Sequence, residues 1–187
     1  APLITISRQY GALGTTLGRR LAQKMNFSLW DQELVHAIAQ NTGVSEELVK
    51  SLDEHWPNTL SEIISNLVIG PKGTEAEYVH QIHRIVHTLE KHGSSIIIGR
   101  GAQFIVKSNK SLKIRCVAPI NQRVERVVAE EKLDKSAAQK KISRIDRERN
   151  QFHQRYFNYD VEDPTHYHLV VNTGTMSIEQ VASTVVA

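Results

Sequence analysis

The 187-residue chain lacks the features that mark a membrane protein, a disulfide-stabilised protein or a nucleic-acid-binding protein. No run of strictly apolar residues is longer than Ile96-Ile97-Ile98, and the N-terminal residues lack the basic and apolar regions of a signal peptide. The single cysteine, Cys116, cannot form an internal disulfide. A formal charge of +3 is too small for a nucleic-acid surface. We therefore expect a cytoplasmic protein without a membrane or nucleic-acid partner.

The beginning of the chain, by contrast, contains the outline of a phosphate-binding loop. A β-branched strand pattern, a glycine-containing turn and an amphipathic helix pattern follow one another. The loop pattern G-x-x-x-x-G-K-[ST] falls on residues 8–15, where its glycines correspond to Arg8 and Leu13 and its lysine to Gly14. An ordinary βα connection, in which glycines only let the chain turn, is the alternative. The rest of the chain has to decide between the two.

Backbone groups can bind phosphate here without the lysine, because consecutive N–H groups and a helix N-terminus attract anions. Arg8 can fold back onto phosphates in the lysine's place, since its planar guanidinium recognises phosphate with two N–H groups; a surface ion pair is the alternative. The hydroxyl of Thr15 or Thr16 can bind Mg²⁺ in such a loop, and Thr15 is the predicted metal ligand. The predicted phosphate- and nucleotide-binding residues are Gly11, Ala12, Leu13, Gly14, Thr15 and Thr16.

Apolar periodicity predicts an α/β domain in which strands alternate with helices. Because ligands bind at the C-terminal ends of strands in such sheets, Arg8 and Arg100 are expected to face one crevice. Arg100 and Asp31 are predicted to bind the acceptor, with a buried pair between the two as the alternative. Strands are expected over residues 3–7, 27–30, 95–98, 112–118 and 169–171, and helices over 15–24, 31–40, 45–54, 58–69, 74–91, 120–131, 136–157 and from Ser177.

Short motifs along the chain extend this pattern. In order they are Ser7-Arg8-Gln9-Tyr10-Gly11, Asp31-x-Glu33-Leu34, Ile97-Ile98-Gly99-Arg100-Gly101-Ala102, Ala118-Pro119 with Arg123 and Arg126, Asp146-x-x-Arg149, Tyr156-Phe157, Asp163-Pro164, and Tyr167-x-Leu-x-x-Asn172-Thr173. From Ile4 to Val186 the set resembles the cytidylate kinase-like family, a branch of the P-loop nucleoside monophosphate kinases. The chain departs from those kinases at Gly14, which replaces the lysine, and at Gly101, where Gly-Arg-Asp would supply a carboxylate.

The resemblance implies a three-layer α/β/α fold of the P-loop NTPase type, with a five-stranded parallel sheet in one domain over residues 1–187. It also implies a helical substrate-binding insert over about 32–92 and an arginine-rich helical lid over about 132–158. Lid arginines close over the transferring phosphate in that family. The resemblance therefore gives catalytic roles to residues of this lid: Arg147 and Arg149, with Asp146 positioning one of them and Arg144 and Arg155 as further candidates. Arg8 joins them as a catalytic cation.

We expect from this resemblance an enzyme that uses ATP with Mg²⁺ to phosphorylate a nucleoside monophosphate, such as cytidylate, or another small anionic acceptor. Two alternatives stay open. In one, Gly14 and Gly101 mark lost chemistry and the chain is a nucleotide-binding regulatory module. In the other it is a small-molecule kinase of shikimate-kinase type, because residues 16–22 look as much like the corresponding helix of those enzymes. A homodimer stays open as an assembly.

Overall fold

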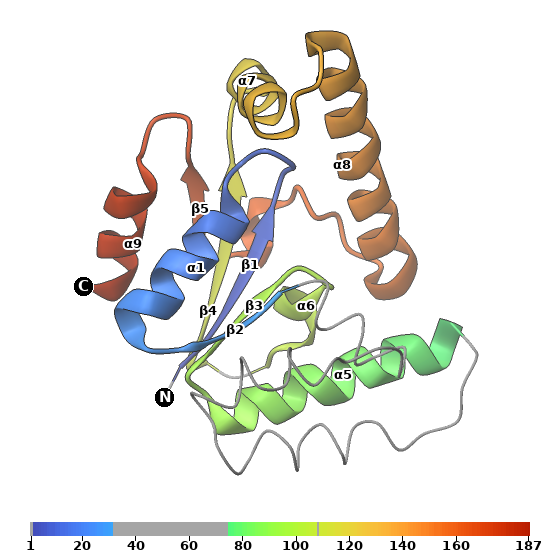
Figure 1. The fold of residues 1–187 in the computed structure, drawn as a ribbon. Coiled ribbons are helices and arrows are strands. Elements are labelled where there is room, and N and C mark those ends of the chain that lie inside the picture. Colours follow the sequence, from blue (N-terminus) through green and yellow to red (C-terminus); the bar gives the residue numbers. More distant parts are fainter. Residues whose placement is uncertain (1, 32–74, 108) are drawn as a thin grey trace, which may run out of the picture.

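Five parallel strands form the centre of the computed structural model, which describes residues 2–31, 75–107 and 109–187 (Figure 1). Within these residues the strands lie in the order β2-β3-β1-β4-β5, and every neighbouring pair is parallel. Each strand predicted from the sequence is confirmed to within one residue at either end. The strands are β1 (Leu3–Arg8), β2 (Ser28–Trp30), β3 (Ser95–Ile98), β4 (Ser111–Val117) and β5 (Leu169–Asn172).

Helices connect these strands and cover the sheet. The described helices are α1 (Gly14–Met25), α5 (Glu75–His92), α6 (Ala102–Ile105), α7 (Ile120–Glu131), α8 (Lys135–Phe157) and α9 (Ile178–Val186), with a 3₁₀ turn at Pro164–His166. The predicted helices over 45–54 and 58–69 lie outside the described residues, as does that over 31–40 except for Asp31. The sequence did not indicate α6 or the 3₁₀ turn, because each is too short to show a periodic pattern.

Alternate residues of the strands fill two cores, one on each face of the sheet. On one face, Ile4 and Ile6 pack with Leu17 of α1 and Val181 of α9. On the other face, Leu3 and Ile97 pack with the apolar side of α5. The α5 residues in that core are Ile82, Ile85, Val86 and Leu89, whose spacing places them on one side of the helix. These two helical layers around the sheet confirm the three-layer α/β/α fold.

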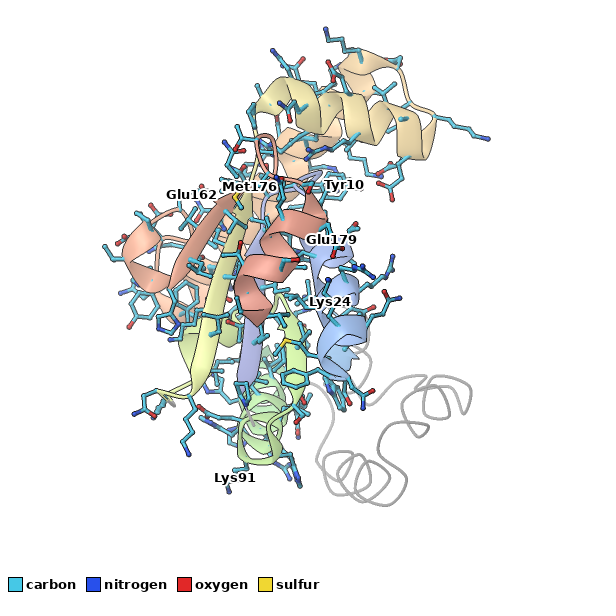
Figure 2. All side chains as sticks on the ribbon, turned by 90° about the vertical axis from the view of Figure 1, so that its left-hand side faces the viewer. Tyr10, Lys24, Lys91, Glu162, Met176 and Glu179 are labelled. Atoms are coloured by element: carbon cyan, nitrogen blue, oxygen red, sulfur yellow. The ribbon has the colours of Figure 1, made fainter. Side chains whose placement is uncertain are left out.

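Helices α7 and α8 stand at one end of the sheet, where the parallel strands end (Figure 1). Ala138 and Ile142 of α8 pack against Val124 and Val127 of α7. Figure 2 shows Tyr10, two residues beyond β1, at this end of the molecule, and Lys91 of α5 at the opposite end. The carboxyl ends of β1 and β3 therefore open towards α8, which is where a doubly wound sheet binds its ligand.

Candidate functional site

The β1–α1 loop (residues 9–13) is held in place by side chains of α7 and α8. Asp146 of α8 accepts hydrogen bonds from the Tyr10 N–H at 2.7 Å and from Arg123 Nη1 at 2.5 Å. Arg123 Nη1 also donates to the Tyr10 carbonyl at 3.3 Å. Asp146, predicted from the sequence to position an arginine of the lid, thus pairs with an arginine of α7 and ties α8 to the loop.

A second clamp comes from α7 and from the segment after β5. Arg126 donates to the Gly11 carbonyl at 3.1 Å and to the Thr173 carbonyl at 2.7 Å. The Thr173 hydroxyl in turn donates to the Ala12 carbonyl at 3.0 Å. Loop carbonyls are therefore bound by protein. The N–H groups in the first turn of α1, which have no acceptor within the helix, are the groups that can bind an anion.

The N-terminus of α1 is built without negative charge. Its N-cap residue, Leu13, has a left-handed backbone at φ +58° and makes no side-chain cap, and the first turn contains no acidic residue. Asp134 and Ser177, by comparison, cap α8 and α9 with their side chains. The positive end of the α1 dipole is thus not neutralised by its own first turn.

A turn of three left-handed residues follows β3. Gly99, Arg100 and Gly101 have φ values of +80°, +54° and +70°. A left-handed backbone costs a residue with a Cβ about 1–2 kcal/mol, so Arg100 is held there by its surroundings. Its guanidinium carbon lies 5.9 Å from the ring centre of Phe152 in α8. A Cβ on Gly101 would lie 2.1 Å from Cε2 of Phe157, so an aspartate at this position would clash with α8.

A pocket of about 590 Å³ lies among the ends of β1 and β3, the start of α1, and α8. Five arginines line it against two carboxylates, so its field is strongly positive and suits a ligand with several negative charges. Thr15 also lines the pocket, close to the start of α1. The charged lining residues are Arg8, Arg19, Arg100, Arg144, Arg149, Asp31 and Glu148.

Arg8 lies deep in this pocket and not on the outer surface of the loop. Burial and the neighbouring guanidinium groups of Arg149 and Arg100 lower the pKa of Arg8 to about 9, while the carboxylate of Asp31 acts in the opposite direction. Arg8 is therefore still protonated at neutral pH, and its charge is held close to two charges of the same sign. A bound anion would relieve this repulsion.

Arg147 and Arg149, both predicted to be catalytic, lie on different sides of α8. Arg149 lines the pocket, donates from Nη1 to the Arg8 carbonyl at 3.1 Å, and places its guanidinium carbon 5.5 Å from the centre of the Tyr10 ring. Arg147 is exposed and lines a separate surface depression with Lys140. In this structure Arg149 faces Arg8 and Arg147 does not.

His153 is a pocket residue that sequence reasoning missed. Its side chain is buried, and Nδ1 lies 2.6 Å from the Arg149 carbonyl, so Nδ1 carries the proton and Nε2 is left as an acceptor. Burial lowers the pKa of His153 to about 4, with smaller contributions from Arg115, Arg8 and Arg149. The imidazole is neutral at pH 7.

Glu148 and Phe152 were also missed, although the sequence holds a weak signal for them. Together with Arg144, which was predicted as a further candidate of the lid, they repeat at spacings of four along α8, which places them on one side of the helix with Arg149. Arg19 lies one turn beyond Thr15 on α1. Arg123 and Arg126 were noted as motif residues, and the structure gives them the clamping role.

The chain matches the model of the cytidylate kinase-like family over residues 3–175. Among individual proteins, the cytidylate kinase of Pyrococcus horikoshii is 27% identical over 186 residues, which is 99% of this chain and 86% of that protein. A uronate isomerase of Corynebacterium glutamicum is 34% identical over 92 residues, or 49% of this chain and only 18% of that protein. The first similarity extends along both chains, whereas the second is confined to part of each.

Solved structures share the fold at low sequence identity. An uncharacterized protein from Eubacterium ventriosum aligns with a TM-score of 0.76 at 17% identity, covering 100% of this chain and 96% of that one. The shikimate kinase of Bacteroides thetaiotaomicron aligns with a TM-score of 0.52 at 15% identity, covering 98% and 96%. At these identities the likeness concerns the fold alone.

No helix in the described ranges has the length and apolar character needed to cross a membrane. The strand order, the loop before α1 and the arginines at the strand ends agree with the family match, which spans most of the sequence. On this evidence the chain belongs to the cytidylate kinase-like family.

Proposed function

We propose that the protein is an ATP-dependent phosphotransferase whose acceptor is a nucleoside monophosphate, with cytidylate as the first candidate. The observation that carries this proposal is the convergence of five arginines, from β1, α1, α8 and the turn after β3, on one pocket beside the start of α1. Phosphoryl transfer is catalysed mainly by positioning and positive charge, and both are available at this place.

The chain's residues fit ATP with Mg²⁺ as cofactor. The uncapped first turn of α1 offers N–H groups to the phosphates, and Thr15 places a hydroxyl at the pocket where it can bind the metal. When bound, ATP supplies the transferable γ-phosphoryl group, and Mg²⁺ neutralises charge on its β- and γ-oxygens. Residues Gly11 to Thr16 are accordingly the proposed nucleotide-binding segment.

The acceptor is proposed to bind between β2, β3 and α8. Asp31, directly after β2, and Arg100, directly after β3, line the pocket on the side away from α7. Burial lowers the pKa of Arg100, and the Tyr78 hydroxyl acts in the opposite direction. A guanidinium also recognises phosphate with two N–H groups. Arg100 can therefore bind the acceptor phosphate, while Arg8 and Arg149 bind the group in transfer.

A nucleotide-binding module without catalysis is the second candidate. The observation favouring it is Gly101, because Phe157 leaves no room there for the carboxylate of the Gly-Arg-Asp pattern. Both candidates bind Mg·ATP, and only the enzyme turns it over. ADP release therefore separates them.

The test combines calorimetric titration of Mg·ATP with measurement of ADP release in the presence of CMP, dCMP, UMP, AMP or shikimate. We expect binding of Mg·ATP and acceptor-dependent ADP release that is greatest with CMP or dCMP. Binding without release for any acceptor would replace the enzyme by the regulatory module. Greater ADP release with shikimate than with any nucleotide would identify the protein as a small-molecule kinase of shikimate-kinase type.

A further inference from the structure

Positions 8 and 14 cannot both carry a side chain in this loop. A Cβ added to Gly14 would lie 2.6 Å from Cβ and 2.9 Å from Cγ of Arg8. The clash involves the base of the Arg8 side chain, which cannot move without the backbone. In the pattern G-x-x-x-x-G-K-[ST] these positions are occupied the other way round, with glycine at the first and lysine at the seventh. The chain has therefore exchanged the two.

The Arg8 side chain uses the space that this exchange opens and runs towards the end of β3. Its Nη1 lies 2.4 Å from the point where a Cβ on Gly99 would be, so a second glycine makes room for the guanidinium. Because β3 is the direct neighbour of β1 and Gly99 precedes Arg100, the Arg8 guanidinium lies beside the turn that carries Arg100. Arg8 thus shares one pocket with Thr15 of the proposed nucleotide-binding segment and with Arg100 of the proposed acceptor site.

We propose that Arg8 is the cation of this phosphate loop, supplied from the first position of the pattern in place of the lysine, and that Gly14 is a glycine because the base of the Arg8 side chain occupies the space of its Cβ. The proposal rests on the function proposed above, since it assumes that the loop binds nucleotide phosphates. It adds that the lysine is absent because another position of the loop supplies the cation, and not because the loop has lost its function.

The physical consequence is a coupling between two substitutions. Arg8→Gly removes the cation, and we expect Mg·ATP to bind about 10- to 100-fold more weakly, as for loss of a charge-assisted hydrogen bond. Gly14→Lys in the presence of Arg8 overpacks the loop, and we expect the melting temperature to fall by about 3–10 °C. In Arg8→Gly/Gly14→Lys the clash is gone and a lysine is present, so both properties should return to near the wild-type values.

Two further variants separate the effect of the clash between positions 8 and 14 from the effect of losing a positive charge. Arg8→Ala/Gly14→Lys keeps the Cβ that causes the clash, so its melting temperature should stay low although the arginine is gone. Arg20→Ala is the matched control for loss of an arginine, because Arg20 pairs with Glu179 on the outer side of α1; Mg·ATP affinity should be unchanged. All proteins are compared by calorimetry with Mg·ATP and by thermal unfolding without ligand.

The outcomes distinguish this inference from the function on which it rests. A wild type that binds no Mg·ATP overturns both proposals. A wild type that binds, with Arg8→Gly binding equally well, overturns the inference alone. The same follows if Arg8→Gly/Gly14→Lys is no better than Arg8→Gly in affinity. Recovery of affinity and melting temperature in that double variant, without recovery in Arg8→Ala/Gly14→Lys, supports the exchange.

Discussion

Arg149 is the side chain through which α8 contacts both the loop and the pocket. It donates to the Arg8 carbonyl and lies over Tyr10, while Arg147, two residues earlier on the same helix, is exposed on another side. Alanine variants of these two arginines can thus be compared in the same protein. The comparison of their activities tests whether the arginine that lines the pocket or the one outside it acts on the transferring phosphate.

We predict that Arg149→Ala lowers the rate of phosphoryl transfer by about 10³-fold or more, because a cation at the transition state has effects of this size. Arg147→Ala should keep most of the activity and should change the free energy of unfolding by less than about 0.5 kcal/mol, as is usual for an exposed residue. ADP release under saturating substrates and urea unfolding measure the two quantities. An equal loss in Arg147→Ala would indicate that Arg147 reaches the phosphate through movement of α8, as the resemblance to the family implies.

His153 makes stability depend on pH. Its pKa is about 4 in the folded protein, mainly because of burial, against about 6.5 in an unfolded chain. Between these values the unfolded chain binds more protons, so stability falls as the pH is lowered from about 6.5 towards 4, by about 3 kcal/mol at most. His153→Gln keeps a donor for the Arg149 carbonyl but cannot be protonated in this range.

We therefore predict that wild type loses more stability than His153→Gln between pH 7 and pH 4.5, measured by urea unfolding at several pH values. The pKa of His83 is also lowered, first of all by burial, but His83 is present in both proteins, so the difference between them reports on His153. Parallel pH profiles would mean that the pKa of His153 in the folded protein is close to its value in the unfolded chain.

At the scale of elements, α8 is anchored at both ends and charged in between. Ala138 and Ile142 pack on α7 in its first half. Near its C-terminal end, the Phe157 ring lies 5.7 Å from that of Phe104. The turns between carry charged side chains, of which Asp146 and Arg149 hydrogen-bond to the backbone of Tyr10 and Arg8, respectively, whereas Arg144 and Glu148 are exposed. Polar contacts, and not a continuous apolar core, therefore hold this part of α8.

We predict that amides in residues 132–158 exchange faster in the free protein than with Mg·ATP and the acceptor both present. The physical reason is that bound anions would join the arginines of α8 to the loop and to β3. Hydrogen exchange measured by mass spectrometry checks this, with α9 as an internal reference on the far layer of the sheet (Figure 1). Equal protection of residues 132–158 in both states would make α8 a fixed structural helix.

At the scale of the whole molecule, the three layers of the α/β/α fold were predictable because each strand and helix is indicated by a pattern within a short stretch of sequence. The run Ser95–Ile98 reads as a buried strand by itself, and Ile82, Ile85 and Leu89 share one side of a helix by spacing alone. The crevice shared by Arg8 and Arg100 was also predictable, since parallel strands end on the same edge of a sheet.

Several hydrogen bonds within the site were not predictable, because they join residues more than a hundred positions apart. Nothing in the sequence pairs Asp146 with Tyr10, or Thr173 with Ala12, since each bond depends on how α7, α8 and β5 are placed in space. The direction of the Arg8 side chain was not predictable either. The side chain runs past Gly14 and ends beside Gly99, and these two glycines are far apart in the sequence.

The contact of Gly101 with Phe157 limits which substitutions the turn after β3 can accept. An aspartate at position 101 would meet the Phe157 ring, and that ring is packed between Phe104 and His83, at 5.7 Å and 6.0 Å. A single codon change that restored the carboxylate would first damage packing, and a change at Phe157 alone would open a gap. A Gly-Arg-Asp sequence at this turn therefore needs a smaller residue at position 157 together with aspartate at position 101.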